Sequence, residues 1–126
     1  ALKSYISPAG VYFQVSEKNK KENISKIENA SEKIDAISGY TYKFKLAPEE
    51  VKKGDKPIKS SGVLAQELEK VLPEAVQKNE KGEYFVDYAA ITPLLIEAIK
   101  DQNEKIKALE NSQNEILKRL DVLEKK

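Results

Sequence analysis

The chain contains no cysteine and no histidine among its 126 residues. Without cysteine it can form no disulfide, no thiolate nucleophile and no zinc cluster bound through sulfur. The absence of histidine removes the commonest general base and the commonest metal ligand. Any serine nucleophile would therefore need a lysine or a carboxylate as its base. We expect neither a metal nor a cofactor.

The chain also lacks an excess of charge of one sign and a long apolar run. It has 22 Lys and Arg against 21 Asp and Glu, a net charge of +1, so no attraction to nucleic acid or to an anionic membrane is expected. Tyr40, Tyr42 and Phe44 could form a base-stacking platform, but the balanced charge favours a place in the core. No apolar run approaches the ~20 residues of a membrane span, and no signal peptide is recognisable. We expect a soluble protein or a fragment of one.

Short strand and helix patterns alternate along residues 10–90, which predicts a small α+β head. The helical pattern that precedes Pro73 ends there, as is usual before a proline. The spacing predicts strands at 10–15 and 40–46, helices at 22–37 and 63–71, a loop with a short helical turn at 48–61, and a hairpin at 75–88 whose turn is 79–82.

From Ile91 to Leu123 the apolar residues follow a heptad, which predicts a coiled-coil helix. About 30 helical residues span roughly 45 Å, more than a head of this size covers, so other chains must bury the stripe. Leucine and isoleucine are mixed at both core positions, which favours three strands, although a dimer or a tetramer is also compatible with the pattern. The first heptad core position is Thr92. The expected trimer seam consists of Leu95, Ile99, Gln102, Ile106, Leu109, Gln113, Ile116, Leu120 and Leu123.

Two segments carry a resemblance to a known family. They are GVLAQELEKVLPEAV at residues 62–76 and VDYAAITPLLIEAIKDQNEKIKAL at residues 86–109. Over about residues 16–110 the chain resembles the C-terminal intramolecular chaperone domain of phage tailspikes, tail fibres and neck appendages. The same family includes the endosialidase chaperone domains, which are self-cleaving serine peptidases, and a related module in a membrane-tethered eukaryotic transcription factor.

The resemblance implies a homotrimer whose long C-terminal helices bundle together. In that family the domain directs folding and trimerisation of the upstream fibre in the same polypeptide and then cuts itself off. The division implied here is 1–15 as the end of the upstream fibre, 16–90 as the chaperone head and 91–126 as the coiled-coil trimerisation helix. Assembly would take place in the host cytoplasm, and the upstream product would enter the virion tail.

Family members cleave just before a serine that opens the motif S-D-x-R-L-K-x-N-I. Laid on this chain, the motif runs from Ser16 to Ile24, and the cut falls between Val15 and Ser16. Besides Ser16 and Ile24, the lysine and the asparagine of the motif are kept at Lys21 and Asn23. The chain departs from the motif at Glu17, Asn19 and Lys20.

The residues themselves permit such a reaction. A serine hydroxyl needs a base, and a lysine is a base only when it is uncharged, a form that burial or neighbouring positive charge favours. Lys18 and Lys20 provide the neighbouring charge, and assembly of three chains would provide the burial. We expect Ser16 to attack the Val15 carbonyl with Lys21 as general base, with an ester formed by acyl shift as the first product. Amide groups at the start of the first helix are candidates for the oxyanion site. Whether Lys21 serves its own chain or a neighbour stays open.

The same residues also have purely structural interpretations, and the chain has alternative functions. Ser16 is an ordinary helix N-cap or loop residue on that view, and the lysines around it are a solvated run. Four further residues are either surface positions or supports of an interchain site, and they are Gln66, Glu67, Asp87 and Tyr88. The alternative function is a structural trimerisation module that does not cut. Release of a transcription factor from a membrane fits less well, because no DNA-binding or membrane segment is visible.

Overall fold

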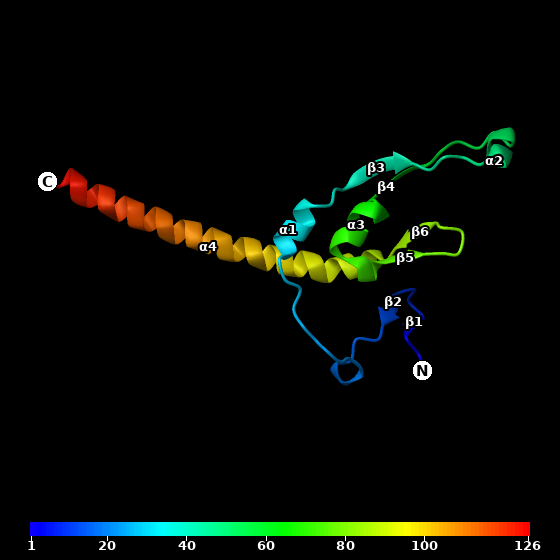
Figure 1. Cartoon of the computed structure of the whole chain (residues 1–126), viewed down its shortest axis with the longest axis horizontal. Helices are drawn as coiled ribbons and strands as arrows, with labels where there is room; N and C mark the ends of the chain where they lie inside the picture. Colours follow the sequence, from blue (N-terminus) through cyan, green and yellow to red (C-terminus); the bar gives the residue numbers. More distant parts are fainter.

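A computed structural model describes all residues from 1 to 126 and shows an α+β chain with one long helix (Figure 1). It contains three separate two-stranded antiparallel sheets. The paired strands are β1 (Ser4–Ile6) with β2 (Tyr12–Gln14), β3 (Tyr40–Lys43) with β4 (Lys59–Gly62), and β5 (Val76–Lys78) with β6 (Tyr84–Val86). The α-helices are α1 (Ala30–Asp35), α2 (Pro48–Lys52), α3 (Ala65–Val71) and α4 (Ile91–Glu124). Three single turns of 3₁₀ helix are η1 (Lys18–Lys20), η2 (Pro73–Ala75) and η3 (Tyr88–Ala90).

The long helix α4 confirms the helix predicted from Ile91 onward. It has 34 residues and therefore spans about 51 Å. Pro93 lies in its first turn, where a missing backbone N–H breaks no helical hydrogen bond. Figure 1 shows α1 and α3 against the first part of α4, while the rest of the helix projects alone. No helix of the chain combines the length and the apolar composition that crossing a bilayer demands.

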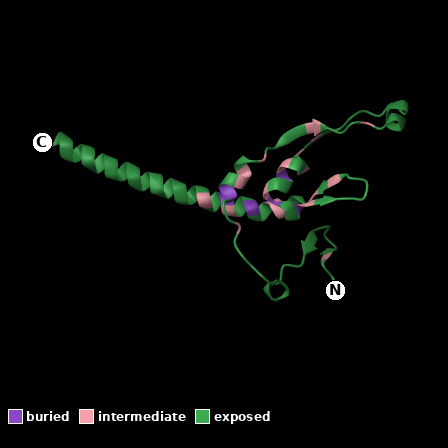
Figure 2. Cartoon of the chain, viewed as in Figure 1, coloured by how far each residue is buried: buried purple, intermediate pink, exposed green.

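The core is small and lies where α1 and α3 pack on the start of α4. Figure 2 shows buried residues only in this region. Leu68 of α3 and Leu94 of α4 are both 0% exposed, and burial of a leucine side chain contributes about 1.5–3 kcal/mol. The core cluster consists of Ala30, Leu68, Leu72, Ala75, Leu94 and Ala98. Only 7 of 126 residues are buried, so most of the apolar side chains of this chain have no internal partner.

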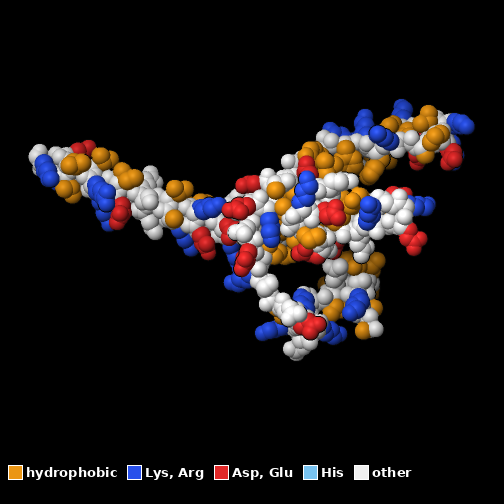
Figure 3. Space-filling view, viewed as in Figure 1, with side chains coloured by type: hydrophobic (Ala, Val, Ile, Leu, Met, Phe, Trp, Pro, Cys, Tyr) orange, Lys and Arg blue, Asp and Glu red, His pale blue; other side chains and the backbone are white.

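The apolar heptad residues of α4 lie outside this core. Leu94 and Ala98 face the head, whereas the apolar seam residues range from 45% exposed at Leu95 to 69% at Leu109. Figure 3 shows apolar side chains spaced along the visible face of the projecting helix among acidic and basic ones. The helix thus has two apolar faces at its start, one covered by its own head and one uncovered.

The predicted helix at 22–37 is wrong in extent, because only Ala30–Asp35 is helical. Asn23 and Asn29 both have a left-handed backbone with φ of 54°, which interrupts a right-handed helix. Ile24 is 63% exposed and has no core to join. A helix of six residues is too short to be stable alone, so α1 exists only where α4 supports it.

The support comes from polar contacts between α1 and α4. The Ser31 N–H donates to Asp101 Oδ2 at 3.3 Å, and the Ser31 hydroxyl donates to the Ala98 carbonyl at 3.3 Å. Asn29, the N-cap residue, makes no side-chain capping bond. Asp101 therefore satisfies a free N–H at the start of α1, the task that an N-cap side chain usually performs.

We predict that Asp101→Ala destabilises the docking of α1 by about 1 kcal/mol, the usual effect of removing a cap. Thermal or urea unfolding of the parent and the variant measures this loss. Glu104→Ala on the projecting part of α4 is the matched control and should leave the midpoint unchanged. Equal midpoints for Asp101→Ala and the parent would show that the contact contributes nothing.

The segment 40–62 forms an arm that differs in part from the prediction. The strand expected at 40–46 is observed as Tyr40–Lys43, and the short helical turn expected in the following loop is α2. The rest of that segment is not all loop, since Lys59–Gly62 forms strand β4. The expected buried face of the first strand is not buried either, because the arm projects from the core and leaves Phe44 66% exposed.

Two other segments follow the prediction closely. The helix expected at 63–71 is α3, which begins at Ala65 and is followed directly by Pro73 in η2. The hairpin expected at 75–88 is β5–β6, and its turn is held by the Asn79 side chain, which accepts from the Lys81 and Glu83 N–H groups at 3.0 and 2.9 Å. Strand β1, which pairs with the strand predicted at 10–15, was not predicted.

Candidate functional site

The predicted serine and lysine are in contact in a single chain. The Lys21 Nζ donates to the Ser16 Oγ at 2.6 Å. The turn η1 separates them, and it is closed by the Lys21 N–H donating to the Lys18 carbonyl at 3.0 Å. Glu17 stands at the N-cap of η1 and accepts from the Asn19 N–H at 3.5 Å. One short turn is therefore enough to bring residues five apart into hydrogen-bond contact.

The bond between Val15 and Ser16 lies in the open, directly after the β1–β2 hairpin. The Val15 N–H donates to the Lys3 carbonyl at 2.9 Å, which extends the hairpin by one residue. Beside the bond is a cavity of about 560 Å³ lined by Ala1, Leu2, Lys3, Gln14, Val15, Glu17, Lys20 and Lys21. Residues 11–26 are all exposed, so water reaches the bond and no other element covers it.

The geometry places a candidate nucleophile against an amine nitrogen. A serine hydroxyl within 2.6 Å of an amine nitrogen has the contact that general-base activation needs. What the single chain lacks is removal of this pair from water, the condition that favours an uncharged amine. Asn23, also part of the motif, occupies one of the two left-handed positions and turns the chain toward α1.

Two of the predicted supporting residues accept hydrogen bonds within the arm and the head. Glu67 accepts from the Ser38 N–H at 3.2 Å and from the Tyr40 hydroxyl at 2.7 Å. Asp87 caps η3 by accepting from the Ala89 N–H at 3.1 Å. None of these bonds involves Ser16 or Lys21, so within one chain these residues make no hydrogen bond to the serine–lysine pair.

Tyr88 occupies the corner between β4 and α3. Its hydroxyl accepts from the Val63 N–H at 3.2 Å, and a Cβ at Gly62 would collide with the same hydroxyl. The fourth predicted residue, Gln66, lies at an apolar groove of about 820 Å³ between the arm and the hairpin, with Phe44, Leu64, Phe85 and Tyr88 among its lining residues. The corner is therefore fixed by close packing of Tyr88 on a glycine.

The contact between Tyr40 and Glu67 has an effect that can be measured. Accepting from the phenol hydroxyl, the Glu67 carboxylate stabilises the protonated phenol and raises the pKa of Tyr40, while Ser38 acts more weakly in the opposite direction. Because the pKa is raised in the folded state, the contact contributes its full stability at pH values below the pKa of tyrosine in the unfolded chain, about 10. It is lost as the pH rises through the higher folded value.

We predict that Tyr40 titrates later than in the unfolded chain in an absorbance titration of the phenolate between pH 9 and 12. Glu67→Gln should bring its titration back toward the ordinary range, because the carboxylate charge is gone. Tyr40→Phe identifies the titration step that belongs to this residue. If Glu67→Gln leaves that step in place, the contact does not form in solution.

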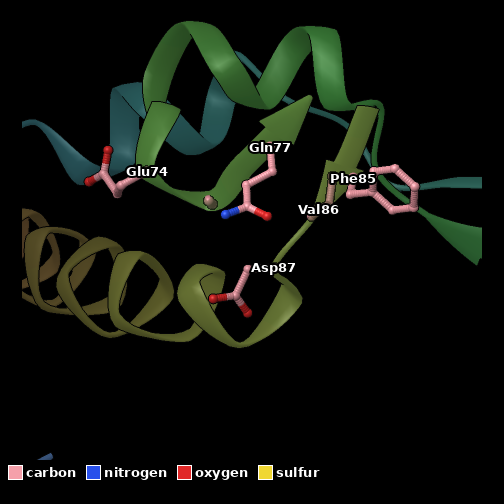
Figure 4. A pocket seen from close by; sticks show the side chains of 6 residues that line it. Glu74, Gln77, Phe85, Val86 and Asp87 are labelled. Carbon is pink, nitrogen blue, oxygen red and sulfur yellow. The ribbon is translucent and has the colours of Figure 1, made fainter. Parts of the chain in front are cut away.

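Sequence reasoning missed a recess below α3, shown in Figure 4. It has a volume of about 280 Å³ and is lined by Glu74, Ala75, Gln77, Phe85, Val86 and Asp87. Asp87 was predicted as a site residue, but Glu74 and Gln77 were not. Glu74 and Ala75 belong to the segment GVLAQELEKVLPEAV, which carries the family resemblance. Nothing in the spacing of that segment indicates that these residues line a recess.

Comparison with known proteins identifies the class of this domain. Residues 16–77 match the family described as chaperone of endosialidase, and the match begins at Ser16. This part of the chain belongs to that family, which confirms the family predicted from the sequence.

Curated relatives add a more particular likeness. The chain is 34% identical over 110 residues to the long tail fiber protein Gp37 of Enterobacteria phage K3, a match over 84% of the chain and 8% of the relative. It is 40% identical over 96 residues to the protein of the same name from Enterobacteria phage M1, over 72% of the chain and 35% of the relative. A third relative of this name, from Escherichia phage AR1, is 36% identical over 83 residues, 64% of the chain and 7% of the relative. The chain thus spans about a third of one relative and less than a tenth of the other two.

Proposed function

We propose that this chain is the intramolecular chaperone of a phage tail fibre protein. It trimerises through α4, directs folding of the fibre segment joined upstream of Ser16, and then releases itself by cutting the bond between Val15 and Ser16. The observation that carries the proposal is the contact of 2.6 Å between Lys21 Nζ and Ser16 Oγ, at the residue where the family match begins. The tail fibre relatives support an upstream fibre as the partner.

The proposed reaction uses groups of this chain alone. The Ser16 Oγ attacks the Val15 carbonyl carbon while uncharged Lys21 takes the hydroxyl proton, and Lys21 then gives that proton to the departing nitrogen of Ser16. The amide bond is thereby exchanged for an ester between Val15 and the Ser16 oxygen. Water hydrolyses this ester, which leaves a carboxylate on Val15 and a free amine and hydroxyl on Ser16.

Trimerisation is proposed from the uncovered seam of α4. Ile106 and Leu109 are 52% and 69% exposed in the single chain, beyond the region that the head covers. Water is a poor environment for such a stripe, and a heptad buries it against identical helices. Gln102 and Gln113 at core positions would fix the register of the bundle. Assembly would also remove Ser16 and Lys21 from water, so cutting follows folding.

The intact mass of the purified chain, compared with that of Ser16→Ala, tests the proposal. Loss of residues 1–15 from the parent alone supports self-cleavage at the proposed bond. If both proteins keep their full mass while sedimenting as trimers, the alternative of a non-cleaving trimerisation module is correct.

A further inference from the structure

The recess below α3 has an uncompensated negative charge. Its lining combines the carboxylates of Glu74 and Asp87 with the Gln77 amide and the apolar side chains of Phe85 and Val86, and it includes no lysine or arginine (Figure 4). The two ion pairs of the chain are Glu97–Lys100 and Asp121–Lys125, elsewhere on α4. Asp87 uses one oxygen to cap η3, which leaves its other oxygen for a partner. The recess therefore suits a cationic group on a hydrocarbon stem.

The cut-site loop at residues 16–21 presents groups of this kind. Lys21 is engaged with Ser16, but Lys18 and Lys20 form no ion pair and are exposed. Both stand on the turn η1, next to the bond that the proposed reaction cuts. The loop thus carries two free ammonium groups beside its reactive pair, with Glu17 as the single acidic residue.

The arrangement of the chain separates the loop from its own recess. In Figure 1 the helices α1 and α3 and the hairpin β5–β6 lie on one side of α4, whereas η1 and the β1–β2 hairpin hang on the other side. The loop is joined to the head only through residues 21–29, which contain no helix or strand. In the view of Figure 1 the loop therefore lies apart from the helices of its own head.

We propose that the recess of one copy binds the cut-site loop of a second copy, with the ammonium groups of Lys18 and Lys20 against the carboxylates of Glu74 and Asp87. The lysine stems pack on Phe85 and Val86, in the way that long cationic side chains cover apolar surface. Opposite charges fix the register of such an interface, and like charges are strongly unfavourable there. This docking excludes water from the neighbouring Ser16 and Lys21. This inference rests on the proposed function, because the docking requires copies of the chain to associate.

Because the chain has no cysteine, a pair of engineered cysteines reports this contact without background. The test protein carries Lys20→Cys and Glu74→Cys together with Ser16→Ala, which keeps every chain whole whether or not the parent cuts. After mild oxidation, a denaturing gel without reductant should show most chains as covalent dimers and trimers. A matched protein with Lys20→Cys and Glu110→Cys, whose second site is on the projecting part of α4, should cross-link at least tenfold less.

Several outcomes would overturn the inference. Chains that migrate as monomers with an internal disulfide would show that the loop occupies its own recess, and free thiols in a sedimenting trimer would show that it occupies neither. Equal cross-linking of the Glu110→Cys control would show random collision. A chain that sediments as a monomer would overturn both the inference and the proposed assembly. Cross-linked trimers of a protein whose parent never cuts would retain the docking and refute only the cleavage.

Charge reversal gives a second readout when the parent cuts. Glu74→Lys places like charge against Lys18 and Lys20 and should slow cleavage about tenfold or more. Adding Lys20→Glu to the same chain should restore most of the rate, because the pair is then opposite again with its signs exchanged. Glu69→Lys, a change of the same charge on the exposed surface of α3, should leave the rate unaltered. A failure of Lys20→Glu to rescue Glu74→Lys would contradict the docking.

Discussion

Replacing Lys21 with methionine should slow cleavage between Val15 and Ser16 by about 10²–10⁴-fold, the range that a positioned general base contributes. Methionine keeps most of the length of the side chain but cannot take a proton from the Ser16 hydroxyl, 2.6 Å away. Lys21→Arg should fail as well, since a guanidinium stays protonated in proteins. The rate is followed as the loss of residues 1–15 in the intact mass.

The controls separate chemistry from folding. Lys45→Met removes a lysine from the exposed arm, far along the chain from the cut site, and should cut at the parent rate. Circular dichroism and sedimentation should show that Lys21→Met folds and assembles like the parent. A Lys21→Met protein that cuts within a few-fold of the parent rate would show that this lysine is not the base.

The second large effect is expected at the seam of α4. In the proposed trimer, Ile106→Asp would place a carboxylate at a core position of each of the three chains. Each chain loses about 1.5–3 kcal/mol of side-chain burial and also has to accommodate an unpaired charge. Over three chains the loss is about 5 kcal/mol or more. The concentration at which a trimer dissociates varies as the square root of its dissociation constant, so this concentration should rise by about 70-fold or more relative to the parent. Sedimentation equilibrium over a dilution series measures this change.

Lys107→Asp is the matched control, because it puts the same residue one position away and off the heptad core. It should change the association constant by less than about tenfold, as expected for an exposed charge. If Ile106→Asp assembles as well as Lys107→Asp does, the heptad is not the interface. The same Ile106→Asp protein should also cut more slowly, because the proposed reaction waits for assembly.

The features that the sequence predicted well are those set by local pattern. Helix α4 follows from the heptad beginning near Ile91, and the β5–β6 hairpin follows from Asn79 and Gly82 between two apolar runs. The contact between Ser16 and Lys21 spans five residues, so a single turn can form it. Each of these depends on residues that are close together in the chain.

The features that the sequence did not reveal depend on distant partners. The start of α1 is set by Asp101, which lies 70 residues beyond Ser31, while the isoleucine spacing predicted a longer helix. Strand β4 has the sequence KSSG, with none of the β-branched or aromatic residues that mark a strand, and it forms because β3 pairs with it. The recess joins η2 to β5, β6 and Asp87, and no spacing rule brings these residues together.

The uncovered seam and the small core together favour coupling of folding to association. The core beneath α3 contains six apolar residues, while fixing the backbone opposes folding by about 1–2 kcal/mol per residue. The uncovered heptad and the apolar groove beside Phe44 and Phe85 are further apolar surfaces. Their burial on association would offset the entropy lost when the backbone is fixed. Folding of the head and association of the helices are therefore expected to occur together, in keeping with the proposed role in fibre assembly.

The fraction of cut chain in separated monomers and trimers would show whether cleavage depends on assembly. The freshly purified parent is resolved into monomer and trimer by sedimentation velocity, each fraction is incubated at neutral pH, and its mass is read over time. We predict that chains in the trimer lose residues 1–15 while monomers keep them, and that Ser16→Ala trimers stay whole. Cutting in the monomer fraction at the trimer rate, or parent trimers that never lose this segment, would contradict this prediction.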